Sequence, residues 1–287
     1  MICSQYIYDT LYAGIRSMQV YLPKDVQVAL QRHAKRAEGL GSTVLKAVEE
    51  NIRLAGESCV PLCQDTGMIL CFVEYGEHAE ISGDSLRYVL ARAVEDAFYD
   101  GYFRKSVVAD PLNVRNNTGT NLPPLIHWEV VPGSSVRISL LAKGFGSENC
   151  SCTEMLKPTA GRRGVITAVE RIMERAGGAP CPPVVLGIGI GGTMDYAAVL
   201  SKKALLRELD DIHPSSYYAS LETDIMEAVN RLGIGPGGLG GGDTCLGVKI
   251  ESSPTHIAGL PLAVSVNCWA DRKFSYCFRP TAAEASV

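Results

Sequence analysis

The spacing of the apolar residues changes part-way along this sequence, and that change limits the folds open to the chain. The first 57 residues carry apolar side chains at three-to-four-residue intervals, which is typical of amphipathic helices. The stretch 22–41 has Pro23 near its start and a glycine at its end, and Ser42 can cap a following helix over 42–57. A further apolar stripe in 85–103 predicts another helix.

Beyond Asn121 the pattern alternates between strand and helix. IHWEVV and VRISLLA alternate apolar and polar residues on either side of a PGSS turn, which predicts a β-hairpin. Helices and buried strands then follow in GVITAVERIMERAGG, PPVVLGIGI, TMDYAAVLSKKALLREL, DIMEAVNRLGIG and LPLAVSVNCWA. No repeat or low-complexity linker divides the chain. We expect an α+β fold in a single domain over 1–287, helical over 1–57, mixed over 58–273, with an irregular tail over 274–287.

Composition narrows the functional classes. With 287 residues, 46% of them hydrophobic, the chain can bury a large core. Its net charge of -4 gives no electrostatic attraction to nucleic acid or to an anionic membrane, and no apolar run is long enough for a membrane span. The start, MICSQYIYDTLYAGIRSM, lacks the basic segment and apolar block of a signal peptide. We expect a cytoplasmic protein that binds neither nucleic acid nor membranes.

The 10 cysteines contain no CxxC pair. In a reducing compartment we expect no disulfide framework, and the missing CxxC argues against a zinc ribbon, a thioredoxin site and the clustered spacing of ferredoxins. Most cytosolic cysteines are buried small side chains, and Cys71 in the apolar run MILCF fits that interpretation. Cys150 and Cys152 could bind metal, although ordinary loop residues are the favoured interpretation.

Three other cysteines lie at the edges of expected elements. Cys63 lies in PLCQDTGMILCF, directly before Gln64 and Asp65. Cys181 lies in APCPP, at the entrance to a buried strand, and Cys268 ends the strand LPLAVSVNC. The local residues leave four roles open for Cys63: nucleophile, disulfide partner, metal ligand or core side chain. The edge positions allow all three side chains to point into a common pocket.

Glycine-rich stretches offer a second set of signals. GIGIGG at 187–192 matches the dinucleotide fingerprint between a strand and a helix, but the following strand with its acidic residue is missing. We favour a tight turn with close packing of strand and helix. GIGPGGLGGGDT at 233–244 lacks the lysine and hydroxyl ending of a P-loop, and its glycines suit unusual backbone angles. With KGFGSEN at 143–149, these stretches predict a shared centre crowded by backbone.

Six motifs together resemble a known family. CQDTG, NNTGTNLPP, KGFGSEN, CPPVVLGIGIGGT, NRLGIGPGGLGG and PTHIAGLPLAVSVNCWADR resemble, in this order, the α part of class I fumarate hydratases, a family that includes the iron–sulfur tartrate dehydratases. The match runs from about residue 15 to residue 273. The resemblance implies that Cys63, Cys181 and Cys268 ligate a [4Fe-4S] cluster buried in the fold, with the fourth iron open to substrate.

The resemblance implies a hydro-lyase that hydrates fumarate reversibly to L-malate, a step of the tricarboxylic acid cycle. The open iron would act as a Lewis acid, and general acid–base groups would move the protons. Asp65, two residues after Cys63, and His256, in PTHIAGLP, are the expected catalytic residues, without an assignment of acid and base. By the same resemblance, Gln64, Arg104 and the backbone of Gly146 contact the substrate.

A physical argument also supports Arg104 as a substrate-binding residue, because a guanidinium can bind a carboxylate through two hydrogen bonds. Arg115 and Lys143 are weaker candidates of the same kind. KGFGSEN and NTGTNLPP favour fumarate as the substrate, whereas Trp269 stands where many fumarases have a histidine. An L-tartrate dehydratase α subunit is therefore the alternative. A dinucleotide-binding module based on GIGIGG and a non-catalytic subunit are rival interpretations from other classes.

The resemblance also implies a partner. Complete class I fumarases have a further β part, fused or separate, that contributes basic substrate ligands. Arg104 is the one well-placed cation of this chain, which is few for a substrate with two carboxylates. We therefore expect a separate β subunit, an α2β2 heterotetramer, and a site at the subunit interface.

Overall fold

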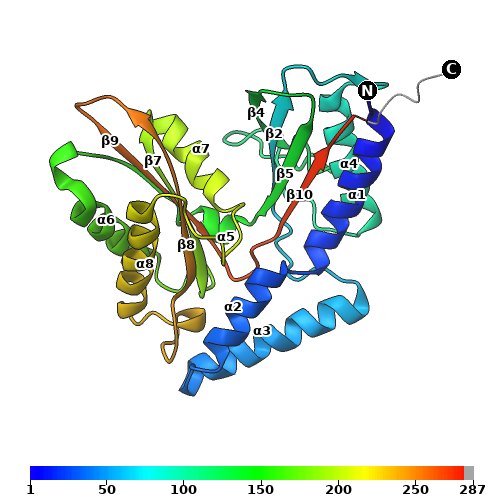
Figure 1. Ribbon diagram of the computed structural model, residues 1–287. Coiled ribbons are helices and arrows are strands. Elements are labelled where there is room, and N and C mark those ends of the chain that lie inside the picture. Colours follow the sequence, from blue (N-terminus) through cyan, green and yellow to red (C-terminus); the bar gives the residue numbers. More distant parts are fainter. Residues whose placement is uncertain (281–287) are drawn as a thin grey trace. The chain divides into compact units, whose positions relative to one another are not determined.

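The computed structural model describes residues 1–280 (Figure 1), and they form two compact units. Unit 1 contains Met1–Tyr21, Leu54–Lys143 and the segment from Arg272 onward, and unit 2 contains Leu22–Arg53 and Gly144–Asp271. The chain passes between the units four times without a change of composition, which explains why the sequence showed no boundary. The α+β fold class is confirmed, and each unit is described by itself.

Unit 1 is a four-stranded sheet with two long helices. Its strand order is β10-β5-β2-β4. Alternate residues of β2, namely Ile69, Cys71 and Val73, are buried in one core with the apolar stripes of both helices, as period-two and period-3.6 patterns require. The elements are β2 (Met68–Gly76), β4 (Leu125–Val131), β5 (Val136–Lys143), β10 (Lys273–Phe278), α1 (Ser4–Val20), α4 (Leu86–Asp100) and the short parallel pair β1 (Ile2–Cys3) and β3 (Ile81–Ser82).

Two expectations fail in this sheet. Strands β4 and β5 are not a hairpin, because β2 lies between them, parallel to β4 and antiparallel to β5. Both predicted strands are present, but the alternation of apolar and polar residues does not show which strands pair with each other. The first five residues of the expected irregular tail, 274–278, belong to β10, which pairs antiparallel with β5. Residues 279 and 280 have no regular secondary structure, as expected, and residues 281–287 lie outside the described part of the chain.

Unit 2 contains the second sheet, ordered β6-β9-β7-β8. Strand β7 lies between β8, which is parallel to it, and β9, which is antiparallel. Figure 1 shows α7 on one face of the sheet and α6 and α8 on the other. The elements are α5 (Phe145–Glu148), β6 (Cys152–Leu156), α6 (Gly161–Ala176), β7 (Val184–Gly192), α7 (Met194–Ala204), α8 (Ser216–Arg231), β8 (Cys245–Thr255) and β9 (Leu260–Asn267), with single 3₁₀ turns at Pro158–Ala160 and Pro236–Gly238.

The GIGIGG stretch is part of strand β7 and serves packing. Ile188 and Ile190 are buried with α6 and α8 in the core of unit 2, whereas the glycines between them face α7. A methyl group on Gly187 would lie 2.1 Å from the carbonyl oxygen of Ser201, and one on Gly189 would lie 1.9 Å from that of Ala197. Only glycine allows a helix to approach a strand so closely. The packing interpretation of this motif is confirmed.

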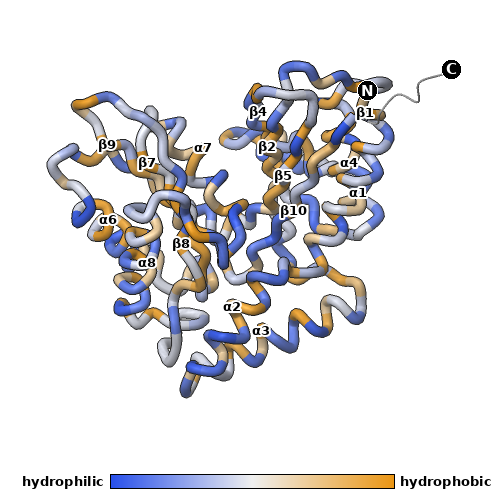
Figure 2. Tube along the Cα trace, viewed as in Figure 1, coloured by the Kyte–Doolittle hydropathy of each residue, from blue (hydrophilic) through white to orange (hydrophobic). Residues whose placement is uncertain are grey.

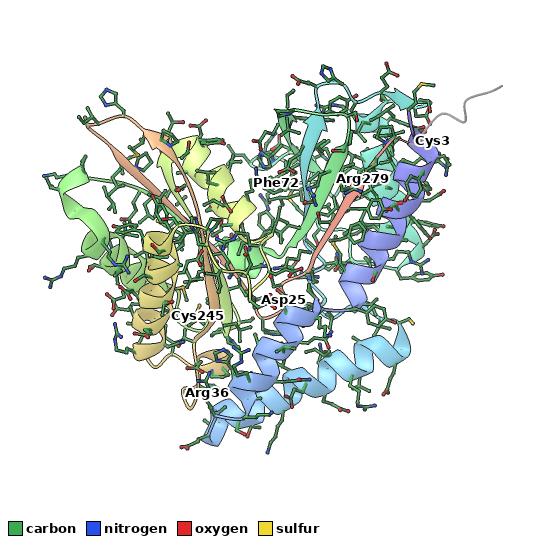
Figure 3. The ribbon with its side chains drawn as sticks, in the orientation of Figure 1. Cys3, Asp25, Arg36, Phe72, Cys245 and Arg279 are labelled. Carbon is green, nitrogen blue, oxygen red and sulfur yellow. The ribbon has the colours of Figure 1, made fainter. Side chains whose placement is uncertain are left out.

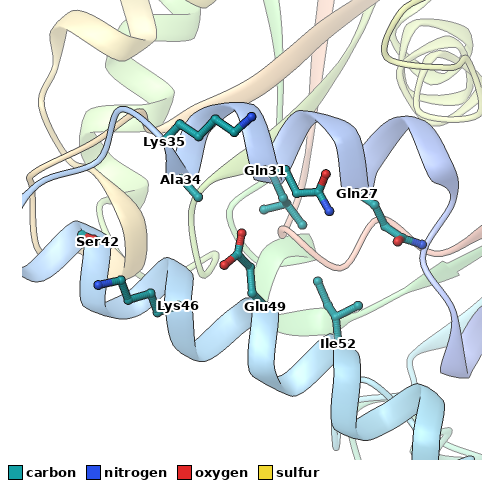
Figure 4. Close-up of a pocket in the computed structure, with 9 residues that line it drawn as sticks. Gln27, Gln31, Ala34, Lys35, Ser42, Lys46, Glu49 and Ile52 are labelled. Atoms are coloured by element: carbon teal, nitrogen blue, oxygen red, sulfur yellow. The ribbon is translucent and has the colours of Figure 1, made fainter.

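A helical hairpin of α2 (Lys24–Ala34) and α3 (Gly39–Ser58) belongs largely to unit 2. Helix α3 begins three residues earlier than expected, so Ser42 lies inside it instead of capping it, and its N–H donates to the carbonyl of Glu38. Apolar and polar residues alternate along both helices (Figure 2). Between them lies a groove of about 520 Å³ (Figure 4), lined by Gln27, Leu30, Gln31, Ala34, Lys35, Ser42, Lys46, Glu49 and Ile52.

Helices α4 and α6 lie close to their predicted ranges, whereas α8 begins eight residues before the predicted start at Asp224 and α7 ends five residues before the predicted end at Leu209. Ser85 caps α4, where its hydroxyl accepts the N–H of Tyr88 at 3.4 Å. Within residues 1–280, no helix combines the length and the apolar character that a membrane crossing requires.

Candidate functional site

The loop that carries Cys63, Gln64 and Asp65 connects α3 to β2 in unit 1. Its backbone is held by Gln19, which lies fully buried near the end of α1. The N–H of Leu62 donates to the carbonyl of Gln19 at 2.9 Å, and the side-chain amide of Gln19 donates to the carbonyl of Thr66 at 2.8 Å. The loop is therefore fixed at both ends by one residue.

Arg272 holds the middle of the same loop. Its Nη2 donates to the carbonyl of Asp65 at 2.8 Å, and its Nη1 donates to the side-chain oxygen of Gln19 at 2.7 Å. Asp65 is half-buried, and its Oδ1 accepts the N–H of Gly67 at 3.1 Å. Gly67 has a φ of 75°, which favours glycine. The direction of the Asp65 carboxylate is thus set by the turn that CQDTG forms.

Two further motifs join this loop within unit 1. The hydroxyl of Thr66 donates to the carbonyl of Arg104 at 2.7 Å. Asn121, from NNTGTNLPP, donates to the carbonyl of Gly67 at 3.1 Å and accepts the N–H of Ser106 at 2.8 Å. CQDTG, FRKS and NNTGTNLPP are therefore one hydrogen-bonded framework, from which the side chains of Gln64 and Arg104 reach solvent.

In unit 2, Cys181 and Cys268 lie at the same end of the sheet. Cys268 directly follows Asn267, and Asn267 is the register partner of Val185, four residues after Cys181. The thiol of Cys181 lies on an exposed residue with a φ of 55°, and Cys268 is half-buried.

Glycine backbone surrounds Cys181. The N–H of Gly237 donates to the carbonyl of Pro182 at 2.8 Å, and a methyl group on Gly238 would lie 2.7 Å from the Cα of Gly178. A methyl group on Gly146 would lie 4.0 Å from the carbonyl oxygen of Ala179. Two of the three glycine stretches, 233–244 and 143–149, thus meet beside Cys181, whereas GIGIGG lies along β7.

The loop over 233–244 has a second anchor in unit 2. Its backbone carbonyl at Gly241 accepts the N–H of Glu38 at 2.7 Å, at the turn between α2 and α3. Beside it, Asp243 pairs with the buried His33 at 2.5 Å. Gly233, Gly235 and Gly240 are among the six glycines of this loop with positive φ, so the unusual backbone angles predicted from the sequence are present.

His256 lies far from Cys268 within unit 2. It occupies the exposed turn after β8, where its Nδ1 accepts the N–H of Ala258 at 3.2 Å. Cys268 follows the other end of β9, a strand of eight residues. At ~3.4 Å per residue, that strand separates the two side chains by roughly 24 Å. The twelve-residue spacing in the sequence therefore does not bring His256 to the cysteine of its own chain.

The cysteines fall into two chemical groups. Cys71 and Cys245 are fully buried in the two cores, and burial raises the pKa of each thiol to about 12 (Figure 3 labels Cys245 on β8). Neither supplies a thiolate. Cys63, Cys181 and Cys268 are partly or fully exposed at the ends of elements, and none of the cysteines described takes part in a disulfide.

This donor set fits a thiolate-bound iron cluster, because the three thiols are reduced, accessible and held on defined backbone. Cys63 belongs to unit 1, and Cys181 and Cys268 belong to unit 2. Within residues 1–280, no three side chains of His, Cys, Asp or Glu converge on a position that could hold a metal ion. Neither unit contains the complete set. Of the weaker candidates, Arg115 is exposed with its guanidinium donating to Pro111, and Lys143 is buried at the end of β5.

Comparison with known proteins gives the family. The model of the fumarate hydratase (fumerase) family matches residues 9–276. The chain belongs to this family. A Methanocaldococcus jannaschii protein, named provisionally as L(+)-tartrate dehydratase subunit alpha, is 40% identical over 274 residues, which cover 93% of this chain and 95% of that protein. The L(+)-tartrate dehydratase subunit alpha of Escherichia coli K12 is 35% identical over 257 residues, which cover 88% and 84%.

Membership of this family identifies the chain as an iron–sulfur hydro-lyase. Sequence reasoning missed three residues that build the site in unit 1. Gln19 is one polar residue on an amphipathic helix, and Asn121 is one of several asparagines in a loop. Arg272 stands inside the CWADR motif, but nothing in the sequence marks it as buried. Their roles depend on contacts between segments that are far apart in the chain.

Proposed function

We propose that the chain is the α subunit of an enzyme that interconverts fumarate and L-malate. The observation that carries this proposal is the framework of unit 1, in which Thr66 holds Arg104 to the loop of Gln64 and Asp65. An amide, a carboxylate and a guanidinium on one hydrogen-bonded scaffold match what a dicarboxylate substrate requires. Dehydration of L(+)-tartrate is the second candidate, and the names of the similar proteins favour it.

Cys63, Cys181 and Cys268 are the proposed ligands of a [4Fe-4S] cluster. Their accessibility at element ends supports this choice over Cys71 and Cys245, whose raised pKa values keep them protonated. When bound, a cluster with three cysteine ligands supplies one open iron as a Lewis acid for the substrate hydroxyl and a carboxylate.

Asp65 is the proposed acid–base residue of this chain. The Gly67 N–H orients its carboxylate. In dehydration this carboxylate would take the proton from the carbon adjacent to the one that carries the leaving hydroxyl, and in hydration it would return that proton. The exposed guanidinium of Arg104 would bind a substrate carboxylate through two hydrogen bonds. Gln64 would donate from its amide, and the backbone at Gly146, which carries no side chain, would donate from its N–H.

His256 is the second proposed catalytic residue. Because it lies at the far end of β9, it can act only at the site of a second copy of the chain. A histidine some two dozen ångströms from Cys268, as roughly eight extended residues require, cannot exchange a proton at the cluster of its own chain. Its role therefore requires a second copy of the chain, which an α2β2 assembly contains.

A mixing experiment tests that condition. His256→Asn and Cys268→Ser chains, each inactive alone, are combined and reassembled with the partner subunit. Random pairing restores one intact site in each mixed dimer, so activity should recover to about a quarter of the wild-type value. A mixture that stays inactive contradicts a role for His256 from a second chain.

The separate β subunit is proposed from the similar proteins. They are named as alpha subunits, and this chain matches them over most of their length. We propose an α2β2 heterotetramer in which the partner supplies further cations for the dianionic substrate. Assay of the chain with and without the partner tests this assembly. Malate dehydration at an enzyme-like rate by the chain alone would refute it.

Substrate choice is tested with the anaerobically purified complex. The values of kcat/KM for L-malate, fumarate and L(+)-tartrate are compared under the same conditions. The proposal expects L-malate and fumarate to be the better substrates by at least about tenfold, since a pocket fitted to one hydroxyl discriminates against a second by that order. A preference for L(+)-tartrate would favour the second candidate, an L(+)-tartrate dehydratase. Inactivity on all three compounds would contradict a hydro-lyase for C4 diacids.

A further inference from the structure

Arg272 is the largest side chain that the described part of the chain buries fully, with 1% of its surface exposed. Its partners are two neutral oxygens, the carbonyl of Asp65 and the side-chain oxygen of Gln19. Among residues 1–280, Nε has no hydrogen-bond partner and no carboxylate pairs with the guanidinium. An arginine is always charged in a protein, so this is a buried cation without a counter-ion.

A buried charge without an ion-pair partner lowers the free energy of unfolding unless another interaction offsets its lost hydration. Buried charged groups are normally paired, and an unpaired one is a marked exception. The backbone of Arg272 is fixed as well, because its carbonyl accepts the N–H of Ala142 at 3.0 Å, directly before β10 begins. The guanidinium is therefore held rigidly against one target, the loop of Cys63 and Asp65.

We propose that Arg272, together with Gln19, is a positioning residue for the proposed cluster site. It would hold the backbone of Cys63, Gln64 and Asp65 in the conformation that presents the thiol and the carboxylate. Its positive charge would also stabilise the negative charge of the Cys63 thiolate and of the cluster that this thiolate would bind. The inference rests on the proposed function, because that function supplies the anionic group.

Chain connectivity strengthens the inference. Arg272 follows Cys268 by four residues, so one short segment carries a proposed cluster ligand at its start and the clamp on the loop of another ligand at its end. Gln19 completes the clamp, since it binds the loop at Leu62 and Thr66 while orienting Arg272. Four hydrogen bonds therefore join Gln19 and Arg272 to each other and to this loop.

Three variants separate the two parts of the clamp. Arg272→Met removes the charge and the donors, Arg272→Lys keeps the charge and loses the forked geometry, and Gln19→Met removes the amide while keeping the volume. Arg162→Met is the control for loss of an arginine outside the loop, because Arg162 hydrogen-bonds Asp224 and Ser220 in unit 2. Arg272→Lys and Gln19→Met keep the test valid should Arg272→Met fail to fold.

The first readout is amide hydrogen exchange of the protein without iron. In Arg272→Met and Gln19→Met, exchange in residues 59–68 should rise about tenfold, the effect of losing one or two buried hydrogen bonds, while β7 exchanges as in the wild type. Arg162→Met should leave residues 59–68 unchanged. Unchanged exchange of this loop, or an equal rise throughout the chain, overturns the positioning role.

The second readout is the reduction potential of the reconstituted cluster. Because positive charge favours the reduced form, Arg272→Met should lower the potential and Arg272→Lys should restore it to near the wild-type value. Equal potentials in all three proteins overturn the charge part of the proposal. Failure of the wild type to take up iron overturns the proposed function instead, whereas normal uptake with unchanged loop exchange in the variants overturns the clamp alone.

Discussion

Gly189→Ala tests the packing of α7 on β7. The added methyl group would lie 1.9 Å from the carbonyl oxygen of Ala197 and 2.7 Å from the N of Ser201, both of them helix backbone. An ordinary contact between these atoms is roughly 3.4 Å, so the helix must move by more than about 1 Å. Forced overpacking of a core typically lowers stability by 1–3 kcal/mol, and backbone on the opposing side places this change at about 3 kcal/mol.

The assay is equilibrium unfolding in urea, with the free energy of unfolding obtained by linear extrapolation. A loss of about 3 kcal/mol is a large fraction of the 5–15 kcal/mol of a typical domain, and it should lower Tm by roughly 6–12 °C in a chain of this size. Gly56→Ala is the matched control, because its methyl group would meet only the ring edge of Tyr21 at 3.3 Å. That helical substitution should leave stability unchanged or raise it by about 0.5–1 kcal/mol. A Gly189→Ala protein within about 0.5 kcal/mol of the wild type would refute the packing account.

Three further predictions concern iron, pH and helix capping. Cys181→Ser should lose the iron that the wild type binds, whereas Cys71→Ser should keep it. Full iron content in Cys181→Ser would contradict its assignment as a ligand. Burial lowers the pKa of His127 below 6.5, so its contribution to stability is complete above pH 6.5 and is lost as the pH falls through the native pKa. His127→Phe should flatten the pH dependence of urea unfolding below pH 6.5, and an unchanged slope would speak against it. Ser85→Ala should lower the free energy of unfolding by about 0.5–2 kcal/mol through loss of the cap, and a neutral result would show that the cap contributes nothing.

Local patterns in the sequence predicted much of the fold. The apolar stripe of α4 was visible, because an amphipathic face depends on neighbouring residues alone. Burial of Cys71 followed from its apolar run. The sequence also favoured packing over dinucleotide binding for the GIGIGG stretch, because the expected acidic strand was missing.

Pairing between distant segments could not be predicted in this way. β4 and β5 read as a hairpin because the short turn joins them, but the hydrophobic face of β2 competes for the same edges and lies between them. Strands β2, β6, β8 and β10 were not predicted. Ser42 met every local rule for a cap, yet the backbone of the glycine loop at Gly241 extends the helix start to Gly39.

The site was predictable where the motifs are contiguous and hidden where they are not. CQDTG specifies its own turn through Asp65 and Gly67, so the sequence located it. The clamp of Gln19 and Arg272 joins positions 253 residues apart, and neither residue belongs to a local pattern. His256 shows the reverse case, because it lies 12 residues from Cys268 in the sequence and an extended strand separates the two residues in space.

Iron and sulfide analysis of the Cys63→Ser protein tests the central claim most directly. The wild type and the variant are purified without oxygen together with the partner subunit, and their iron, acid-labile sulfide and absorption near 400 nm, where iron–sulfur clusters absorb broadly, are measured side by side. The account predicts about four iron atoms per chain and a brown colour for the wild type, with loss of both in Cys63→Ser. Full iron content in Cys63→Ser, or a colourless wild type that still dehydrates malate, would contradict it.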